Sequence, residues 1–298
     1  MSVKLSGIVI PAVTPFDDSG RIAESLLSAN LKAWGLTQVS GYMFLGSNGE
    51  FRSLSDDESL RVAQLAIAGK QDKYLILGIG RESTYQTLAF LERVAQLPEG
   101  IDFVSVLTPS YFANSMTAAA LEAHFIKVAD TSPIPVLLYI APGFANQVTP
   151  TPVLIARLAD HPNIVGIKDT SKTMMGDYLG AIGGREDFSI MAGSVGNLRE
   201  CLAGGGTGGV VSAANYLPAD CAEIYALFTA GLIGQAWEKL DEVKELASAT
   251  AGKFSVAGVK ACMNIVGLGG GYPRLPVLPA DAADVAAMAQ TLNQPRHP

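Results

Sequence analysis

Short apolar runs alternate with amphipathic stretches along most of this chain, and this alternation restricts its fold more than any other feature. The runs recur about every 20 to 35 residues and are rich in Val, Ile, Leu and Phe. They predict strands at residues 7–13, 41–45, 74–79, 103–107, 136–140, 164–168, 188–192 and 209–212. The intervening stretches predict helices at residues 23–34, 55–68, 83–96, 117–130, 152–159, 198–203 and 219–228. Ser55 with Glu58 has the form of a capping box at the start of the second helix.

Repeated strand–helix units are typical of an α/β fold with a parallel sheet. Eight such units in 298 residues predict a closed (β/α)8 barrel, the TIM barrel. A doubly wound sheet is the alternative, but no GxGxxG motif opens a helix after the first predicted strand. The glycine run at 204–209 lacks the Lys-Ser/Thr ending of a P-loop, so we interpret it as a tight turn before the eighth strand.

Beyond residue 228 the pattern contains helices only, predicted at residues 236–250, 259–266 and 281–292. In the first of them acidic residues mix with Lys239 and Lys244, as expected of a solvated face. No Pro/Ser-rich linker precedes these helices. We therefore predict a catalytic barrel over residues 1–231 and a C-terminal helical extension packed on it over residues 232–298.

Composition excludes several classes of partner. Hydrophobic residues make up 49% of the chain and charged residues 16%, enough apolar material for a large core. The net charge of −7 argues against nucleic acid or an anionic membrane surface as partner, but allows a small anionic substrate. The N-terminal apolar run is broken by Pro11 and Pro15, which indicates a first strand and not a signal peptide. No apolar run is long enough to cross a membrane, so we expect a soluble cytoplasmic protein.

The cysteines and histidines give no sign of a metal site. Cys201, Cys221 and Cys262 lie far apart without a CxxC pair, which is typical of buried thiols in a reducing compartment. His124, His161 and His297 fall on a predicted helix, in a loop and in the tail, and none belongs to an HExxH motif. We expect neither a metal nor another cofactor.

The sixth predicted strand, Ile164-Val165-Gly166-Ile167-Lys168, ends in a lysine. Chemistry in (β/α)8 barrels takes place at the C-terminal ends of the strands. An amine placed there among apolar side chains has a lowered pKa, and a neutral amine attacks carbonyl carbon. The alternative is that Lys168 is only the first solvated residue after the strand.

The segment after the second strand, Gly46-Ser47-Asn48-Gly49-Glu50 (the 46–50 loop), offers a hydroxyl, an amide and flexible backbone N–H groups. Ser47, Asn48 and Gly49 could therefore bind a carboxylate. The alternative is a plain turn in which Glu50 caps a helix.

Further polar or small residues end other strands. Tyr139 ends the fifth strand and Tyr111 follows the fourth. A tyrosine at such a place is either a core residue with a satisfied hydroxyl or a proton shuttle. Gly193 and Ser194 end the seventh strand, where the glycine leaves space beside the backbone, and Ser212 ends the eighth.

Taken together, these strand ends hold one amine, two phenols and several hydroxyls, without a cluster of metal-binding side chains. This set suits imine chemistry on a 2-oxo acid, with the lysine as nucleophile, a phenol as proton relay and the 46–50 loop on the carboxylate. The alternatives are a synthase or dehydratase with the same imine chemistry, a non-catalytic oxo-acid binding protein and a metal-dependent aldolase.

At these residues the chain resembles a known family, the pyruvate-type class I aldolases related to dihydrodipicolinate synthase and N-acetylneuraminate lyase. The resemblance extends from Gly7 to about Pro279. The matching motifs are the 46–50 loop, Thr108-Pro109-x-Tyr111, Tyr139-x-x-Pro142, Gly166-Ile167-Lys168-Asp169 and Ala192-Gly193-Ser194.

The resemblance implies residue roles and an assembly. Lys168 would form the Schiff base, Tyr139 would shuttle the proton, and Ser47 with Asn48 would bind the carboxylate of the 2-oxo acid. Tyr111 would complete a proton relay, often by reaching into a neighbouring subunit. The family is usually tetrameric, so the resemblance also implies a homo-oligomer built as a dimer of dimers.

Within the family, the likeness is closest to 4-hydroxy-2-oxoglutarate aldolase, for example at Glu82-Ser83-Thr84. Phe144 stands where dihydrodipicolinate synthases carry an arginine for the carboxylate of the aldehyde partner, and Ser110 stands at their interface tyrosine. An apolar ring cannot donate to a carboxylate. We therefore predict cleavage of a 4-hydroxy-2-oxo acid such as 4-hydroxy-2-oxoglutarate. The alternative is a dihydrodipicolinate synthase-like condensation or the dehydration of a sugar-derived 2-oxo acid.

Overall fold

The computed structural model describes residues 4–182 and 184–294. Within these residues, eight strands follow one another in sequence order around a closed barrel. The strands are β1 (Gly7–Pro11), β2 (Gly41–Phe44), β3 (Tyr74–Gly78), β4 (Phe103–Leu107), β5 (Val136–Ile140), β6 (Ile164–Asp169), β7 (Ser189–Ala192) and β8 (Gly208–Val210). The TIM barrel predicted from the alternating pattern is confirmed, and every strand lies within two residues of its predicted start.

Helices alternate with these strands and then continue to the end of the described chain. They are α1 (Glu24–Gly35), α2 (Asp56–Gly69), α3 (Thr84–Val94), α4 (Ala118–Thr131), α5 (Pro152–Leu158), α6 (Met175–Ile182), α7 (Val195–Ala203), α8 (Pro218–Thr229), α9 (Ile233–Ala249), α10 (Ser255–Ile265) and α11 (Ala282–Leu292). Single 3-10 turns are η1 (Phe51–Ser53), η2 (Ala113–Ser115), η3 (Pro142–Phe144), η4 (Ser212–Asn215) and η5 (Ala251–Lys253).

The sequence pattern did not locate α6. This helix is short, and its sequence MGDYLGAI contains Gly176 and Gly180, which lower helix propensity. A segment this short that contains two glycines shows too little hydrophobic periodicity to be distinguished from a loop. The capping box predicted for α2 is confirmed: Ser55 Oγ accepts from Glu58 N at 3.1 Å, and the Glu58 carboxylate accepts from Ser55 N at 2.9 Å.

The described chain divides into two compact units. The first consists of the chain up to Val9 together with Tyr74–Val211, and the second consists of Ile10–Lys73 and the chain from Ser212 on. The barrel and C-terminal extension proposed from the sequence, with their boundary between residues 231 and 232, stay a prediction.

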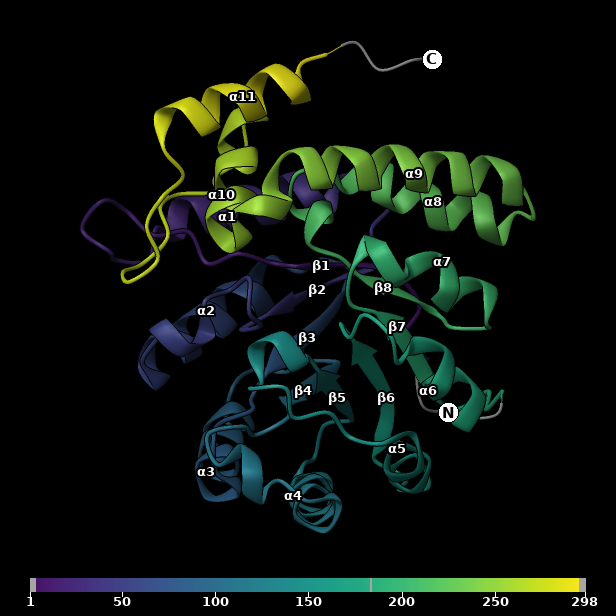
Figure 1. Ribbon diagram of the computed structural model, residues 1–298. Helices are drawn as coiled ribbons and strands as arrows, with labels where there is room; N and C mark the ends of the chain where they lie inside the picture. The colour runs from purple at the N-terminus through teal and green to yellow at the C-terminus, as the bar shows by residue number, and fades with distance from the viewer. Residues whose placement is uncertain (1–3, 183, 295–298) are drawn as a thin grey trace. The chain divides into compact units, whose positions relative to one another are not determined.

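In the first unit the strands pair in parallel, and β5 and β6 align Leu138 with Ile167 and Tyr139 with Lys168. All residues of β4 to β8 are buried, as expected of parallel strands covered on both faces. Figure 1 shows α3, α4, α5 and α6 on the outside of these strands. Residues 204–207 of the glycine run connect α7 to β8, in agreement with the predicted turn, and Gly208 and Gly209 belong to β8 itself.

In the second unit the C-terminal helices pack against one another. α8 and α9 lie side by side, and α10 contacts α11 (Figure 1). The predicted solvated face of α9 is confirmed, because Glu238, Asp241, Glu242, Lys244 and Glu245 are exposed.

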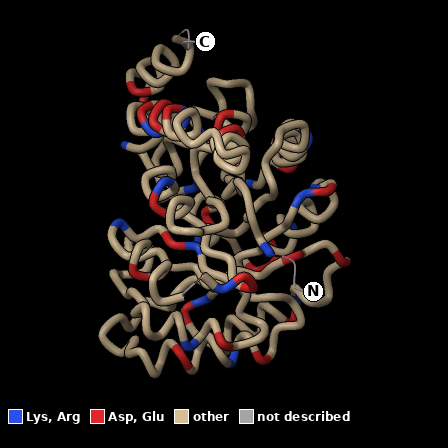
Figure 2. The backbone as a smooth tube through the Cα atoms, turned by 90° about the vertical axis from the view of Figure 1, so that its right-hand side faces the viewer, with Lys and Arg blue, Asp and Glu red and all other residues tan. Residues whose placement is uncertain are grey.

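Acidic and basic residues are interspersed along the chain in Figure 2, so their electrostatic fields partly cancel.

The three cysteines, His124 and His161 lie where the sequence placed them. Cys201, Cys221 and Cys262 are buried free thiols. His124 lies on α4 and His161 in the turn before β6, while His297 lies outside the described residues. Of the helices in the described part of the chain, none combines the length and the apolar character that crossing a membrane requires.

Candidate functional site

Lys168 is a buried lysine of the first unit. It is the penultimate residue of β6, and only 3% of its surface is exposed. Burial penalises the charged ammonium and lowers the pKa of Lys168 from the ordinary 10.5 to about 7. The alternative of a solvated residue beyond the strand is therefore wrong. An amine with this pKa is neutral in a large fraction of molecules near neutral pH, so it can act as a nucleophile.

Tyr139 lies directly beside Lys168. The two residues are Cα partners on the adjacent strands β5 and β6, which places both side chains on the same face of the sheet. The Nζ atom of Lys168 lies 4.0 Å from the centroid of the Tyr139 ring, and Tyr139 itself is 4% exposed. The structure thus brings together the amine and the phenol that the sequence predicted as nucleophile and proton shuttle.

Asp169 follows Lys168 and points to the opposite face of the strand. It is completely buried, and burial raises the pKa of its carboxyl group to about 6 against the hydrogen bonds that Ser171 donates to it. Its backbone carbonyl accepts from Gly193 N at 2.6 Å and from Asn197 Nδ2 at 3.0 Å. These contacts fix the backbone at the end of β6, and therefore also the position from which the Lys168 side chain projects. From the sequence, Asp169 was identified only as part of a motif, without a role, and Asn197 was not identified.

Gly193 and Ser194, predicted as binding residues, have structural tasks as well. A Cβ on Gly193 would lie 2.7 Å from the Asp169 carbonyl oxygen and 2.1 Å from Thr170 Cγ2. The space beside this glycine is therefore occupied by the chain itself, and a larger residue would push β6 and β7 apart. Ser194 precedes α7, and its Oγ donates to Asn197 Oδ1 at 3.0 Å.

Tyr111 and Phe144 are exposed in the loops that follow β4 and β5. Tyr111 is 76% exposed and packs edge-on against Phe112, with ring centroids 4.9 Å apart. The backbone N–H groups of Ser110 and Tyr111 donate to Glu82 Oε2 at 3.0 and 2.8 Å. Glu82 thus fixes the backbone of this loop while leaving the Tyr111 ring on the surface. Phe144, in η3, is 56% exposed.

The remaining predicted binding residues belong to the second unit. Asn48 Nδ2 donates to Ser212 Oγ at 2.8 Å, which joins two of them directly. Ser47, Asn48 and Ser212 are half-buried, so each keeps some contact with solvent. A Cβ on Gly49 would lie 3.3 Å from the carbonyl oxygen of Ala12, so a side chain fits there only if the neighbouring backbone moves.

The backbone on both sides of this segment is in the left-handed region. Leu45 has φ 58° and Glu50 has φ 50°, although neither is glycine. Such a conformation costs about 1–3 kcal/mol per residue and persists only where the surroundings hold it. Strain of this kind is typical of binding segments whose shape is set in advance.

The interpretation of Glu50 as a helix-capping residue is wrong. Glu50 precedes η1, but its side chain caps no backbone N–H there. Its carboxylate instead forms an ion pair with Lys260 of α10, a buried residue that the sequence reasoning missed. The sequence does mark this residue, because Lys260 is the only charged residue between positions 254 and 273 and directly follows the run Val256-Ala257-Gly258-Val259. A lone lysine in such a run calls for a buried partner, by the same argument that identified Lys168.

The described residues can also be compared with the requirements of a metal site. Within residues 4–182 and 184–294, no group of three His, Cys, Asp or Glu side chains is arranged to hold a metal ion. The Tyr139 ring lies against the Lys168 amine, and Ile164, Val165 and Ile167 precede Lys168 in β6.

The lowered pKa of Lys168 predicts how stability depends on pH. The unfolded chain holds this proton up to the ordinary pKa of 10.5, whereas the folded chain releases it at about 7. Between these values the unfolded state binds more protons, so the free energy of unfolding rises with pH. Below pH 7, the buried amine costs roughly 4–5 kcal/mol. We expect Lys168→Met to be more stable than the wild type near pH 6, with an excess that shrinks toward about pH 10.

Urea unfolding of both proteins across this pH range measures the effect. Lys127→Met is the matched control, because Lys127 is an exposed lysine on α4. Its stability is expected to follow the wild type at each pH. Parallel curves for Lys168→Met and the wild type would contradict the lowered pKa.

Known proteins share both sequence and fold with this chain. It matches the Dihydrodipicolinate synthetase family over residues 4–295. It is 30% identical over 302 residues to the probable 4-hydroxy-2-oxoglutarate aldolase, mitochondrial, of Emericella nidulans, which covers 97% of this chain and 94% of that protein. It is also 30% identical to the 4-hydroxy-tetrahydrodipicolinate synthase of Acidiphilium cryptum, with 96% of this chain and 97% of that protein covered.

A similar solved structure is that of YagE, a prophage protein of the dihydrodipicolinic acid synthase family from E. coli K12, in complex with pyruvate. It superposes with a TM-score of 0.90 at 25% identity, covering 98% of this chain and 99% of YagE. The match to the family thus extends over nearly the whole sequence and over the whole barrel. The chain belongs to the dihydrodipicolinate synthetase family and is a lyase of the aldolase type.

Proposed function

We propose that this protein is a Schiff-base-forming aldolase that cleaves a 4-hydroxy-2-oxo acid such as 4-hydroxy-2-oxoglutarate. The observation that carries the proposal is the buried amine of Lys168 at the end of β6, with its Nζ 4.0 Å from the Tyr139 ring. Imine formation needs an amine that is neutral near neutral pH, and burial supplies it by lowering the pKa of Lys168 to about 7.

The first half of the reaction forms the imine. The Lys168 nitrogen attacks the C2 ketone of the substrate, and a C–N bond forms. The carbonyl oxygen takes up protons and leaves as water, which yields a protonated imine between Lys168 and C2. Tyr139 is the proposed carrier of these protons, because its ring lies against the Lys168 amine.

The second half breaks the carbon–carbon bond. A base removes the proton of the C4 hydroxyl, the C3–C4 bond breaks, and its electron pair moves into the protonated imine to give an enamine. C4 leaves as the carbonyl of an aldehyde or oxo acid. Protonation of the enamine at C3 and hydrolysis of the imine release pyruvate and restore Lys168. We assign the proton transfers to Tyr139, with Tyr111 completing the relay.

The substrate carboxylate needs hydrogen-bond donors. We assign this task to Ser47, Asn48 and Gly49, whose hydroxyl, amide and backbone N–H groups are the donor types that bind carboxylates. The left-handed backbone at Leu45 and Glu50 supports the assignment, because a strained loop is one whose shape is set before binding. Gly193, Ser194 and Ser212 are proposed for the rest of the substrate.

A synthase-type condensation is the second candidate, supported by the equal identity to the synthase of Acidiphilium cryptum. Cleavage is favoured by Phe144, which is exposed where a synthase would present an arginine. An apolar ring offers no donor to the carboxylate of an aldehyde partner.

We also propose that the protein is cytoplasmic and works as a homo-oligomer, a dimer of dimers. The exposed rings of Tyr111 and Phe112 support this assembly, because aromatic residues are enriched at subunit interfaces. Under this proposal Tyr111 would serve the relay of a neighbouring copy.

Borohydride reduction in the presence of pyruvate tests the imine. We expect a stable covalent adduct on the wild-type chain, with the mass of reduced pyruvate, and peptide mapping that places it on Lys168. Reversible pyruvate binding without a trapped adduct would instead indicate a non-catalytic binding protein.

Turnover of a substrate panel separates cleavage from condensation. A set of 4-hydroxy-2-oxo acids is assayed for pyruvate release, and pyruvate with a carboxylate-bearing aldehyde is assayed for condensation. Cleavage of the first set with negligible condensation is the expected outcome. Efficient condensation would reverse the assignment.

A further inference from the structure

The second unit contains a buried lysine outside the proposed chemistry. Lys260 lies on α10 and is only 1% exposed. Its Nζ donates to the carbonyl oxygens of Thr14 at 2.7 Å and Tyr272 at 2.8 Å, and it pairs with the Glu50 carboxylate. These acceptors use all of the donors that an ammonium group has. The Phe16 ring lies 4.5 Å from the same nitrogen.

Glu50, the partner of this lysine, is also buried, with 4% of its side chain exposed. Its second oxygen accepts from the backbone N–H of Arg274 at 2.9 Å. One carboxylate thus joins α10 to the segment before α11. The backbone of Glu50 is left-handed, a conformation that a non-glycine residue keeps only when its surroundings hold it. The two contacts of its carboxylate supply that hold.

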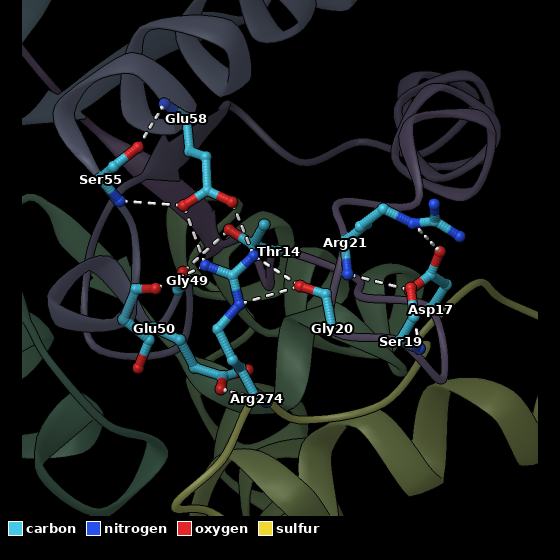
Figure 3. A network of polar contacts seen from close by, with 11 residues as sticks. Thr14, Asp17, Ser19, Gly20, Arg21, Gly49, Glu50, Ser55, Glu58 and Arg274 are labelled. Atoms are coloured by element: carbon cyan, nitrogen blue, oxygen red, sulfur yellow. Dashed lines mark hydrogen bonds and ion pairs between the residues drawn. The ribbon is translucent and has the colours of Figure 1, made fainter.

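Arg274 is itself fixed from several sides. Figure 3 shows its guanidinium facing the Glu58 carboxylate, which it contacts through two nitrogens at 2.7 and 2.9 Å. The same guanidinium donates to the carbonyl oxygens of Gly20 and Ser53. Since Glu58 also closes the capping box of α2, the anchor of Glu50 is tied to the start of that helix.

The lysine also reaches the 46–50 loop by a second route. Thr14 accepts from Lys260 through its carbonyl, and the Thr14 hydroxyl donates to the Gly49 carbonyl at 2.8 Å (Figure 3). Within the loop, Glu50 N donates to Ser47 O at 3.1 Å. The C-terminal half of the loop is therefore fixed at the Gly49 carbonyl and at the Glu50 carboxylate. Lys260 contacts the first through Thr14 and the second directly.

A buried ion pair adds little to the stability of a protein, because the cost of desolvating both charges offsets most of their attraction. Apolar residues of similar size in the same place would stabilise the fold as much. It does define geometry, because each charge accepts few positions of the other. We propose that Lys260 is a positioning residue that, through Glu50 and Thr14, holds the 46–50 loop in the shape in which Ser47 and Asn48 bind the carboxylate of the 2-oxo acid. This inference rests on the proposed function of the same loop.

Two ketones distinguish positioning of the carboxylate from a general loss of structure. Pyruvate and acetone both form an imine that borohydride traps, but acetone lacks the carboxylate. We expect Lys260→Met to raise the pyruvate concentration that gives half-maximal trapping by roughly 10- to 100-fold, the size of effect that a misplacement of about 1 Å can cause. Trapping by acetone is expected to stay within about twofold of the wild type.

Lys260→Met leaves Glu50 buried without its partner and can fail to fold for that reason alone. The double variant Glu50→Gln/Lys260→Met removes both charges and is expected to show the same selective loss. Lys253→Met is the matched control, since Lys253 is exposed in η5. Thermal unfolding of each variant verifies that it is folded at the assay temperature.

The outcomes separate the inference from the function on which it rests. An unchanged half-maximal pyruvate concentration in the folded double variant would overturn the positioning role. An equal loss with pyruvate and acetone would overturn it as well, because the effect would then be general. A wild-type chain that pyruvate and borohydride leave unmodified would overturn the proposed function, and the positioning role with it.

Discussion

Replacing Lys168 with alanine is expected to abolish turnover of 4-hydroxy-2-oxo acids, with a loss of roughly 10⁴-fold or more in kcat. The reason is chemical: without the amine no imine forms, and the C3–C4 bond has no electron sink. The variant is also expected to lose the pyruvate adduct completely in borohydride trapping. Steady-state assays of pyruvate release and intact mass measurement check both results.

The control for this variant is Lys127→Ala, which removes an exposed lysine of α4 and is expected to keep full activity and full trapping. Lys168→Ala also removes a buried charge, so the variant is expected to remain folded, and thermal unfolding verifies this. Full activity of a folded Lys168→Ala protein would rule out the imine mechanism.

Replacing Tyr139 with phenylalanine is expected to lower kcat by roughly 10²- to 10³-fold, the range that a positioned acid or base contributes. Phenylalanine keeps the ring that lies 4.0 Å from Lys168 Nζ, so the burial of the amine stays the same. The pyruvate adduct is therefore still expected to form, although more slowly. Comparison of kcat with the final extent of trapping separates the proton shuttle from the nucleophile.

Tyr85→Phe serves as the control, because Tyr85 is 82% exposed on α3 and lies outside the proposed chemistry. It is expected to match the wild type in both measurements. If Tyr139→Phe turned over at the wild-type rate, Tyr139 would be only a core residue, the alternative that the sequence left open.

Most of the barrel could be predicted from the sequence, because burial on both faces leaves a continuous apolar run at each parallel strand. The run around Val136–Ile140 shows the principle, since all of its residues are buried. The helix α6 could not be predicted, because Gly176 and Gly180 interrupt a segment of only 8 residues.

The residues of the candidate site differ in how much of their surroundings could be predicted from the sequence. Lys168 and Tyr139 were predictable as neighbours, because each lies near the C-terminal end of its strand and the two strands are consecutive in a parallel barrel. The close contacts of Gly193 were not predictable, since they depend on how closely β7 approaches the end of β6. Sequence spacing carries no information on that distance.

The sequence by itself determined the fold class and the chemical inventory of this protein: the order of strands, the lysine at the end of the sixth and the polar loop after the second. Periodicity and strand ends are local properties, so a single chain displays them. Only the tertiary structure decided that Lys168 is buried enough to lower its pKa to about 7, and that Glu50 pairs with Lys260. Both depend on contacts between residues far apart in sequence, because desolvation and ion pairing arise only when the chain has packed.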